Sequence, residues 1–339
     1  MTNSLKKHRM LVITDHTLHK SGDSIYPLLR AMAKNPACSA LEIASRGVPK
    51  NQAFFNDHII TPLTTFPIND NFAYQKNGAQ FLQTNHQVFL QDFDIVFLRI
   101  GRPVSDLFLK FIAECCSKQL IINRPSAIAE TGAKDFLINF PEICAPMKIC
   151  STIDEILEMY NKFPIVLKPL RSYAGHGMIR ILSDTIWDGE TKYSLHQNQS
   201  FLEAKIQEQG QYLAMKYLKN VSLGDKRIIV VNGQAVGATL RIPKEGSWLC
   251  SLAQGGISSF AEPDVTESKI VETISPILTK KGIVFFGFDT LVDDDGYRVL
   301  SEINTLNVGL LSEAELYSGQ PVIQKSADLI WSYISETMA

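Results

Sequence analysis

The sequence lacks the features that define several large classes of protein. Its 339 residues carry 33 basic and 35 acidic side chains, a net charge of −2, and no basic stripe with interleaved aromatic residues, so nucleic acid is not an expected partner. No apolar run is long enough to cross a membrane. The run at residues 10–13 ends at Asp15 and His16, too early for a signal peptide. A cytoplasmic protein is therefore expected.

Two common chemical signatures are also missing. The six cysteines form no C-x-x-C pair and no zinc-binding spacing, which favours buried, reduced thiols. The chain contains neither G-x-x-x-x-G-K-S/T nor G-x-G-x-x-G, so the two best-known nucleotide-binding loops are absent. An apolar content of 45% with 20% charged residues is typical of a globular chain of two or three lobes.

The first third of the chain alternates between strand and helix patterns. Strands are predicted at residues 11–14, 41–44, 95–98 and 120–122, with a helix at residues 25–33. Such alternation favours a parallel sheet whose ligands bind at the carboxyl ends of the strands. Those ends carry Asp15, Arg99, Arg102, Asn123 and Arg124. Together they are predicted to line a cleft, whereas any one of them taken singly is better explained as an ordinary loop residue. Residues 51–85 are rich in polar residues and proline and are interpreted as a long irregular connection.

A lysine next to a glycine-containing loop follows in the middle of the chain. Residues 163–169 predict a strand that carries Lys168, and the loop at residues 171–177 contains Gly175 and Gly177 before a second strand at residues 178–182. Glycine lets backbone N–H groups approach phosphate oxygens, and lysine supplies a positive charge. An ordinary hairpin is the alternative. Upstream, a helix that begins at Ser126 is predicted to carry Lys134 near its middle.

Asn232-Gly233 lies between two apolar runs and predicts a tight hairpin. This hairpin brings Arg227 and Arg241 to the same end. The segment that follows, through Ala253-Gln254-Gly255-Gly256, is interpreted either as a mobile loop with glycine hinges or as an exposed loop without a role.

A second hairpin carries three oxygen-bearing side chains. Asp289 lies on the strand at residues 283–292, and Glu302 and Asn304 share one face of the strand at residues 297–303 and its end. A carboxylate within an apolar strand needs a partner, and a hard cation such as Mg²⁺ (or Mn²⁺) accepts this ligand set. An exposed hairpin with solvated acids is the alternative. Residues 312–339 predict a helix that packs on the core.

The order of these segments resembles bacterial glutathione synthetase and, more broadly, the ATP-grasp ligases. The resemblance runs from residue 95 to about residue 304, with a weaker match at Asp15 and residues 20–24. Its most specific blocks are residues 121–126, 166–170, 224–227 with 230–233, 241–243, 255–256, 287–289 and 302–304. It implies an α/β (α+β) chain with an ATP-grasp fold behind an N-terminal parallel-sheet lobe. The implied domains are residues 1–124, a small subdomain at 125–212 and a large subdomain at 213–339.

The resemblance also implies roles for individual residues. Arg241 is the implied catalytic residue on the transferred phosphate, and Asp289, Glu302 and Asn304 are the implied magnesium ligands. The implied ATP-binding residues are Lys134, Lys168, Gly175, Gly177, Met215, Lys216, Tyr217, Leu218 and Asp225. The implied substrate-binding residues are Asp23, Ser24, Arg99, Arg227, Gly255 and Gly256.

The implied reaction uses ATP as a co-substrate to join a small-molecule acid to an amine. A carboxylate attacks the γ-phosphate to give an acyl phosphate and ADP, and the amine then displaces phosphate. In this family the acid is γ-glutamylcysteine and the amine is glycine. The resemblance also implies an assembly of identical subunits.

Departures from the family pattern keep two alternatives open. The glycine loop reads Arg171-Ser172-Tyr173-Ala174-Gly175-His176-Gly177 where Asp-Gly-x-Gly-Gly is usual, and residues 99–103 lack the usual lysine and aspartate of Arg-Lys-Asp-Pro-Pro. Residues 304–310 and 257–259 also differ. One alternative is an ATP-grasp ligase for another acid and amine pair. The other is a regulatory ATP-binding protein without ligase activity, which the joint presence of Lys168, Arg241 and Glu302 opposes.

Overall fold

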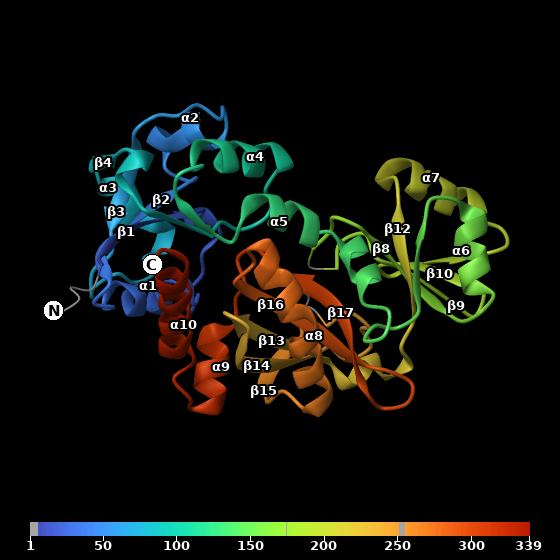
Figure 1. Ribbon diagram of the computed structural model, residues 1–339. Coiled ribbons are helices and arrows are strands. Elements are labelled where there is room, and N and C mark those ends of the chain that lie inside the picture. Colours follow the sequence, from blue (N-terminus) through green and yellow to red (C-terminus); the bar gives the residue numbers. More distant parts are fainter. Residues whose placement is uncertain (1–5, 174, 251–254) are drawn as a thin grey trace.

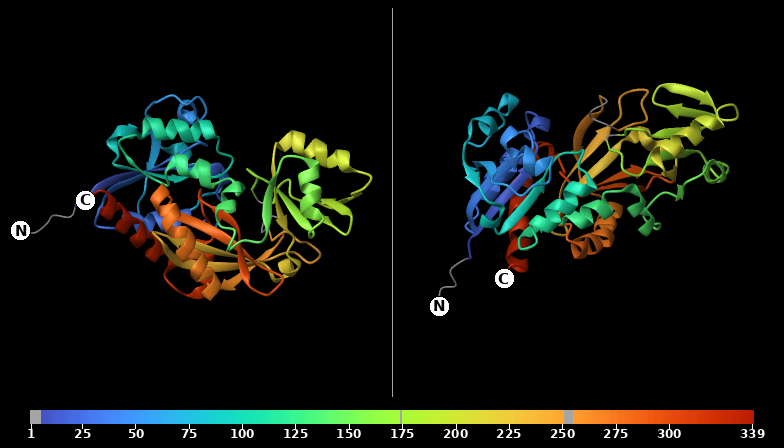
Figure 2. Two further views of the ribbon diagram at one scale, coloured as in Figure 1. Left: turned by 45° about the vertical axis from the view of Figure 1, so that its right-hand side comes forward. Right: turned by 90° about the horizontal axis from the view of Figure 1, so that it is seen from above.

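The computed structural model describes residues 6–173, 175–250 and 255–339. Three sheets organise these residues. The first and third sheets pack close together, whereas the second stands to one side (Figure 1) and stays separated from the first when the molecule is turned (Figure 2). None of the described helices has the length and apolar character needed to span a membrane.

The first sheet is mainly parallel, as the alternation of strands and helices predicts. β1 (His8–Thr14) pairs in parallel with β2 (Cys38–Ser45) and with β5 (Ile95–Arg99), which in turn pairs in parallel with β6 (Leu120–Ile122). Helix α1 (Ile25–Ala33) covers one face with five buried side chains. These strands are buried on both faces and therefore consist of continuous apolar residues, which is why the sequence predicts them.

The interpretation of residues 51–85 as irregular is wrong. They contain α2 (Gln52–Phe55), β3 (Leu63–Pro67) and α3 (Ala79–Gln83). β3 pairs antiparallel with β2, and β4 (Gln87–Val88) pairs with β3 at the sheet edge. The buried Asn51 amide bonds to the backbone of Ser45 and Thr64. These contacts between distant residues order the segment, and local sequence patterns do not report them.

Every strand pair of the second sheet is antiparallel, and all its strands lie between residues 147 and 216. Its strands are, in spatial order, β11 (Thr191–Ser194), β10 (Thr185–Asp188), β9 (Ile179–Leu182), β8 (Ile165–Pro169), β12 (Tyr212–Lys216) and β7 (Met147–Cys150). Helices α6 (Ile153–Tyr160) and α7 (Gln199–Gln209) share a hydrophobic core with this sheet. Because β12 runs to Lys216, the expected boundary between residues 212 and 213 falls inside a strand and is corrected to follow it.

The third sheet is antiparallel and consists of two hairpins with an added edge strand. Its strands are, in spatial order, β15 (Ile257–Ala261), β14 (Gln234–Ile242), β13 (Asp225–Val231), β16 (Phe285–Val292) and β17 (Arg298–Asn304). Asn232 and Gly233 both have positive φ, 46° and 75°, as a type I′ turn requires. Helix α8 (Val265–Lys281) covers this sheet in Figure 1.

The chain segment that connects the first sheet to the second differs from the expected single helix through Lys134. α4 (Asp106–Cys115) packs on α5 (Pro125–Thr131), which ends at Gly132, and Lys134 begins the separate 3₁₀ turn Lys134–Asn139. Asn123, expected at a cleft edge, is instead 5% exposed, and its amide bonds to the backbone of Val284, Phe285 and Thr305. It joins the two sheets.

The chain ends in two packing helices rather than one. α9 (Leu311–Ser318) is followed by α10 (Val322–Thr337), and Gly319 between them has φ 66°. The Trp331 indole donates to the Met32 carbonyl of α1 at 3.1 Å. The last helix therefore closes the N-terminal lobe against the third sheet, beside α1 in Figure 1.

Candidate active site

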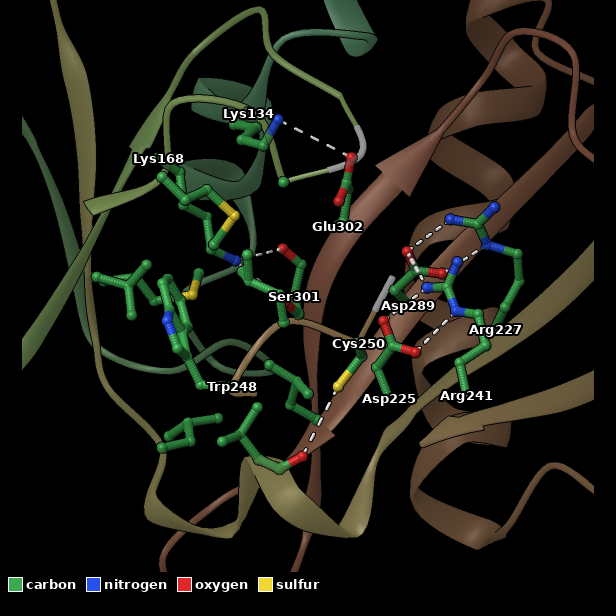
Figure 3. A pocket seen from close by; sticks show the side chains of 18 of the residues that line it. Lys134, Lys168, Asp225, Arg227, Arg241, Trp248, Cys250, Asp289, Ser301 and Glu302 are labelled. Carbon is green, nitrogen blue, oxygen red and sulfur yellow. Dashed lines mark hydrogen bonds and ion pairs between the residues drawn. The ribbon is translucent and has the colours of Figure 1, made fainter. Parts of the chain in front are cut away.

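The main cavity lies between the second and third sheets and has a volume of about 390 Å³. Strands β8 and β12 supply one wall, and strands β13, β14, β16 and β17 supply the other. Figure 3 shows the side chains that point into it. Of the residues implied by the family resemblance, the cavity is lined by Lys134, Lys168, Gly175, Met215, Lys216, Tyr217, Leu218, Asp225, Arg227, Arg241, Asp289, Glu302 and Asn304.

One end of the cavity is apolar and lies along residues 215–218. Trp248, Leu249 and Cys250 also line it, although the sequence analysis assigned them no role. They come from an irregular segment with no periodic pattern, and only the folded chain brings them opposite β12. A flat apolar end of this kind suits a planar aromatic base.

A cation–π cluster borders this apolar end. The Arg180 guanidinium lies 4.4 Å from the Trp187 ring centroid, 5.4 Å from that of Tyr217 and 5.3 Å from that of Trp248. It thus links β9 and β10 of the second sheet to the segment that precedes residue 251. Such contacts stabilise by roughly 0.5–2 kcal/mol each.

The opposite end of the cavity carries two buried lysines. Lys168 is 6% exposed and donates to the Ser301 carbonyl at 3.2 Å and its hydroxyl at 3.1 Å. Lys134 is 7% exposed, donates to the Ser172 carbonyl and lies 3.9 Å from Glu302 Oε1. Burial lowers the pKa of Lys168, and Glu302 opposes that effect. Two ammonium groups near each other favour an anion in this part of the cavity.

Two arginines and two aspartates form a tight charge cluster on the third sheet. Arg227 binds both oxygens of Asp289 at 2.7 Å, and Arg241 binds both oxygens of Asp225 at 2.7 and 2.6 Å. Arg241 Nη2 also lies 2.8 Å from Asp289 Oδ2. Register explains the cluster, because Asp225 faces Arg241 and Arg227 faces Asp289 across neighbouring strands.

The charge cluster shifts the ionisation of both carboxyl groups. Burial raises the pKa of Asp225 to about 6, although Arg241 opposes it. Burial also opposes ionisation of Asp289, but Arg227 and Arg241 together hold the pKa of that carboxyl well below its usual range. In this structure, the partners of Asp289 are therefore two guanidinium groups and not the metal ion that the sequence predicts.

Asp289, Glu302 and Asn304 meet on adjoining strands. Asp289 pairs with Glu302 and Gly287 pairs with Asn304 in the β16–β17 register, and the Asn304 amide nitrogen lies 3.5 Å from Asp289 Oδ2. No cluster of three or more His, Cys, Asp or Glu side chains with metal-site geometry occurs among the described residues. Two carboxylates and an amide oxygen nevertheless supply the hard oxygen donors that Mg²⁺ prefers.

The glycine segments contribute unequally to the cavity. Gly175 lines it, whereas Gly177, two residues later, does not; their φ angles are 76° and 69°. Gly255 and Gly256 are not among its lining residues. Ala174, Ala253 and Gln254 of the expected loops lie outside the described residues.

Asp15 and the expected substrate-binding residues Asp23, Ser24 and Arg99 lie outside this cavity. Their contacts lie within the first lobe or join it to residues 308–312. Asp15 pairs with Arg46 at 2.7 Å, the Asp23 carboxylate accepts from the Lys20 backbone, and the Ser24 hydroxyl accepts from Ser312 N. Burial lowers the pKa of Arg99 to about 10, and its guanidinium donates to the Val308 carbonyl at 2.6 Å.

Arg124 is exposed and lies over Gly282. Of the strand-end residues, Arg102 alone among those described lines a second pocket.

The fold of this chain is that of an ATP-grasp protein, and its main cavity lies between two antiparallel sheets. The model of the prokaryotic glutathione synthetase ATP-grasp domain matches residues 133–315, more than half of the chain. The chain therefore belongs to the prokaryotic glutathione synthetase family, as the sequence resemblance predicts.

Curated relatives agree with this assignment, and solved structures share the fold. A glutathione synthetase of Bradyrhizobium diazoefficiens is 26% identical over 330 residues, covering 94% of each chain. One from Prochlorococcus marinus is 30% identical over 239 residues, covering 69% of this chain and 73% of that protein. The D-cycloserine synthetase DcsG has a TM-score of 0.63 at 12% identity, covering 95% and 98% of the two chains. A RiPP-associated ATP-grasp ligase of Chryseobacterium gregarium has a TM-score of 0.60 at 13% identity, covering 96% and 97%. These two structures share the ATP-grasp fold with this chain.

Proposed function

We propose that this protein is an ADP-forming carboxylate–amine ligase that makes glutathione from γ-glutamylcysteine, glycine and ATP. The observation that carries the proposal is the cavity between β8–β12 and the third sheet. It joins an apolar end to a cationic end and to the Asp289, Glu302 and Asn304 oxygens. Membership of the prokaryotic glutathione synthetase family and the names of the curated relatives support the choice of acid and amine.

We assign the nucleotide to the cavity with its base against residues 215–218 and its phosphates toward Lys134 and Lys168. The apolar end is the part of the site that suits a flat base, and Asp225 lies between the two ends, where a ribose hydroxyl can donate to a carboxylate. The buried ammonium groups lie where the triphosphate is most negative. Their burial strengthens their attraction for phosphate because water screens them little.

The donor set of Asp289, Glu302 and Asn304 fits Mg²⁺ or Mn²⁺, with one adjustment. Both oxygens of Asp289 are engaged by arginines in this structure, so Asp289 has to give up at least one arginine contact to bind a metal. When bound, the metal neutralises phosphate charge and orients the nucleotide. Arg241 is then the cation released from Asp289, and we assign it to the phosphate that is transferred.

The chain's own residues reduce the repulsion between two anions. The acid's carboxylate attacks the γ-phosphate to form an acyl phosphate and release ADP, and the amine displaces phosphate to form the amide. Lys168 and Arg241 hold positive charge on opposite sides of the cavity, where negative charge spreads over the transferring oxygens. We also propose substrate contacts by Arg227, Gly255 and Gly256. The loop around Gly255 and Gly256 is proposed to exclude water from the acyl phosphate.

We further propose that the enzyme works in the cytoplasm as an assembly of identical subunits, because its co-substrate is ATP and the resemblance implies such an assembly. A ligase for a different acid and amine is the second candidate. The observation that favours it is the basic glycine loop, in which Arg171 reaches Asp106 of α4 at 3.1 Å.

One assay separates the two candidates. Purified protein is incubated with Mg-ATP, γ-glutamylcysteine and glycine, and ADP release and glutathione are followed together by enzymatic coupling and mass spectrometry. Equal amounts of ADP and glutathione support the proposal. ATP binding with neither product refutes glutathione synthesis and turns attention to another acid and amine. The Glu302→Gln variant serves as the inactive control.

A further inference from the structure

A second pocket of about 230 Å³ adjoins the nucleotide cavity. It lies between the N-terminal end of α4, helix α5 and the glycine loop, and Tyr173 lines both pockets. Its walls include Val104, Leu109, Ile128 and Leu306, which are apolar. Neither Lys134, Lys168 nor the proposed metal ligands line it, so whatever it binds is distinct from the phosphates of ATP.

Two arginines and one aspartate, Asp106, supply the charged side chains of this pocket. Arg171 is 61% exposed and pairs with Asp106 at 3.1 Å. Arg102 has no ion pair or side-chain hydrogen bond among the described residues. Burial lowers the pKa of Arg102, and Glu302 is the carboxylate that most opposes this effect. Desolvation of a half-buried guanidinium is unfavourable, and a bound anion offsets this free energy.

Arg99 is implied by the family resemblance to bind the substrate, but its guanidinium is not free to bind an anion. Its guanidinium is buried against the Phe285 ring at 4.7 Å and donates to the Val308 carbonyl. Arg102, three residues later, is the guanidinium that faces a pocket. Its position is constrained, because a Cβ at Gly132 would lie 2.9 Å from Arg102 Nη2. The absence of a side chain at residue 132 therefore leaves the guanidinium room in the pocket.

We propose that Arg102, assisted by Arg171, binds the carboxylate of the acid substrate that does not react. This inference rests on the proposed function and names the specificity residues for its acid. The acid then spans from the second pocket, past Tyr173, to the phosphates of the main cavity. In γ-glutamylcysteine the remote group is the α-carboxylate of the glutamyl residue. A guanidinium binds such a carboxylate in a two-pronged geometry that an ammonium group lacks.

The test measures binding of two acids by calorimetry, with Mg²⁺ and a non-hydrolysable ATP analogue present. The acids are γ-glutamylcysteine and γ-aminobutyrylcysteine, which lacks only the glutamyl α-carboxylate. We expect the wild-type protein to bind the first about 10- to 100-fold more tightly, the range for a charge-assisted hydrogen-bond pair.

Variants assign this preference to a residue. Arg102→Ala is expected to weaken γ-glutamylcysteine binding to the level of the analogue while leaving analogue binding and nucleotide binding unchanged. Arg102→Lys should recover part of the preference, and Arg171→Ala should lose less because Asp106 already engages Arg171. Lys118→Ala, at an exposed residue outside the pocket, removes one positive charge and serves as the matched control. Thermal unfolding checks that each variant is folded.

The outcomes separate this inference from the proposed function. Equal binding of the two acids by the wild-type protein overturns the inference, as does an equal loss for both acids in Arg102→Ala or no binding of γ-glutamylcysteine. Carboxylate-dependent binding without ADP release refutes glutathione synthesis but supports the role of Arg102. Glutathione formation that does not depend on Arg102 supports the proposed function and refutes the role of Arg102.

Discussion

Replacing Arg241 by methionine tests the charge cluster and the catalytic proposal together. Methionine keeps much of the apolar stem and removes the guanidinium, which makes two contacts with Asp225 and one with Asp289. Asp289 retains both of its 2.7 Å contacts with Arg227, whereas Asp225 loses its bidentate partner. The variant therefore leaves the largely buried Asp225 carboxylate without its guanidinium partner.

Two separate effects are expected. If Arg241 acts on the transferred phosphate, kcat falls about 10²- to 10³-fold, or roughly 2.7–4 kcal/mol, while ATP still binds. Breaking a buried ion pair destabilises a protein by about 3–5 kcal/mol when the remaining charge stays ionised. The pKa of Asp225 is already raised to about 6 by burial and rises further without Arg241. The carboxyl group can therefore take up a proton and reduce this loss.

The sign of the pH effect follows from that shift. A carboxyl whose pKa is higher in the folded than in the unfolded state contributes stability at low pH, and this is lost as pH rises through the folded pKa. The variant is thus expected to be destabilised more at pH 8 than at pH 6, by up to about 1.4 kcal/mol for each pH unit over which the stranded carboxyl stays protonated.

Urea unfolding at the two pH values and steady-state kinetics measure these effects. The double variant Asp225→Asn with Arg241→Met removes both charges and is expected to regain stability at pH 8 without regaining kcat. Wild-type kcat in Arg241→Met would refute the catalytic role. An equal loss of stability at both pH values would refute the stranded-carboxylate account.

Three further predictions follow from other contacts. Glu302→Gln should abolish ADP formation while ATP analogue still binds by calorimetry, and unchanged turnover would remove Glu302 from the metal site. Burial lowers the pKa of His19 to about 4, so the free energy of unfolding should fall as pH drops from 6.5 toward 4, by about 1–2 kcal/mol at pH 5. Urea unfolding of His19→Gln should show a flatter pH profile. The same profile in the variant and the wild-type protein would contradict this role of His19. Asn123→Ala should cost roughly 3 kcal/mol in urea unfolding because it leaves backbone groups of Val284 and Phe285 unpaired. A loss below about 1 kcal/mol would mean that Asn123 does not join the sheets.

Local patterns predicted the parallel strands of the first sheet, the two hairpins of the third sheet and the order of the family blocks, but not β3 or β4. Asn232-Gly233 fixes its turn because both residues adopt positive φ, and the matching strand registers follow from it. The family and its fold were predicted from blocks of sequence and are confirmed by the family model over residues 133–315. The acidic hairpin similarly brings Asp289 opposite Glu302.

Tertiary structure decided the partners of the charged side chains. Nothing local to Asp289 indicates that two guanidinium groups bind it, because Arg227 and Arg241 reach it from two other strands. Likewise, Arg99 and Arg102 lie three residues apart, yet one is buried against Phe285 and Val308 while the other faces a pocket. The sequence determined the parallel strands of the first sheet, the hairpins of the third sheet and the family to which the chain belongs. Only packing between distant segments determined which charges are neutralised and which remain available to a ligand, because burial and pairing depend on the whole fold.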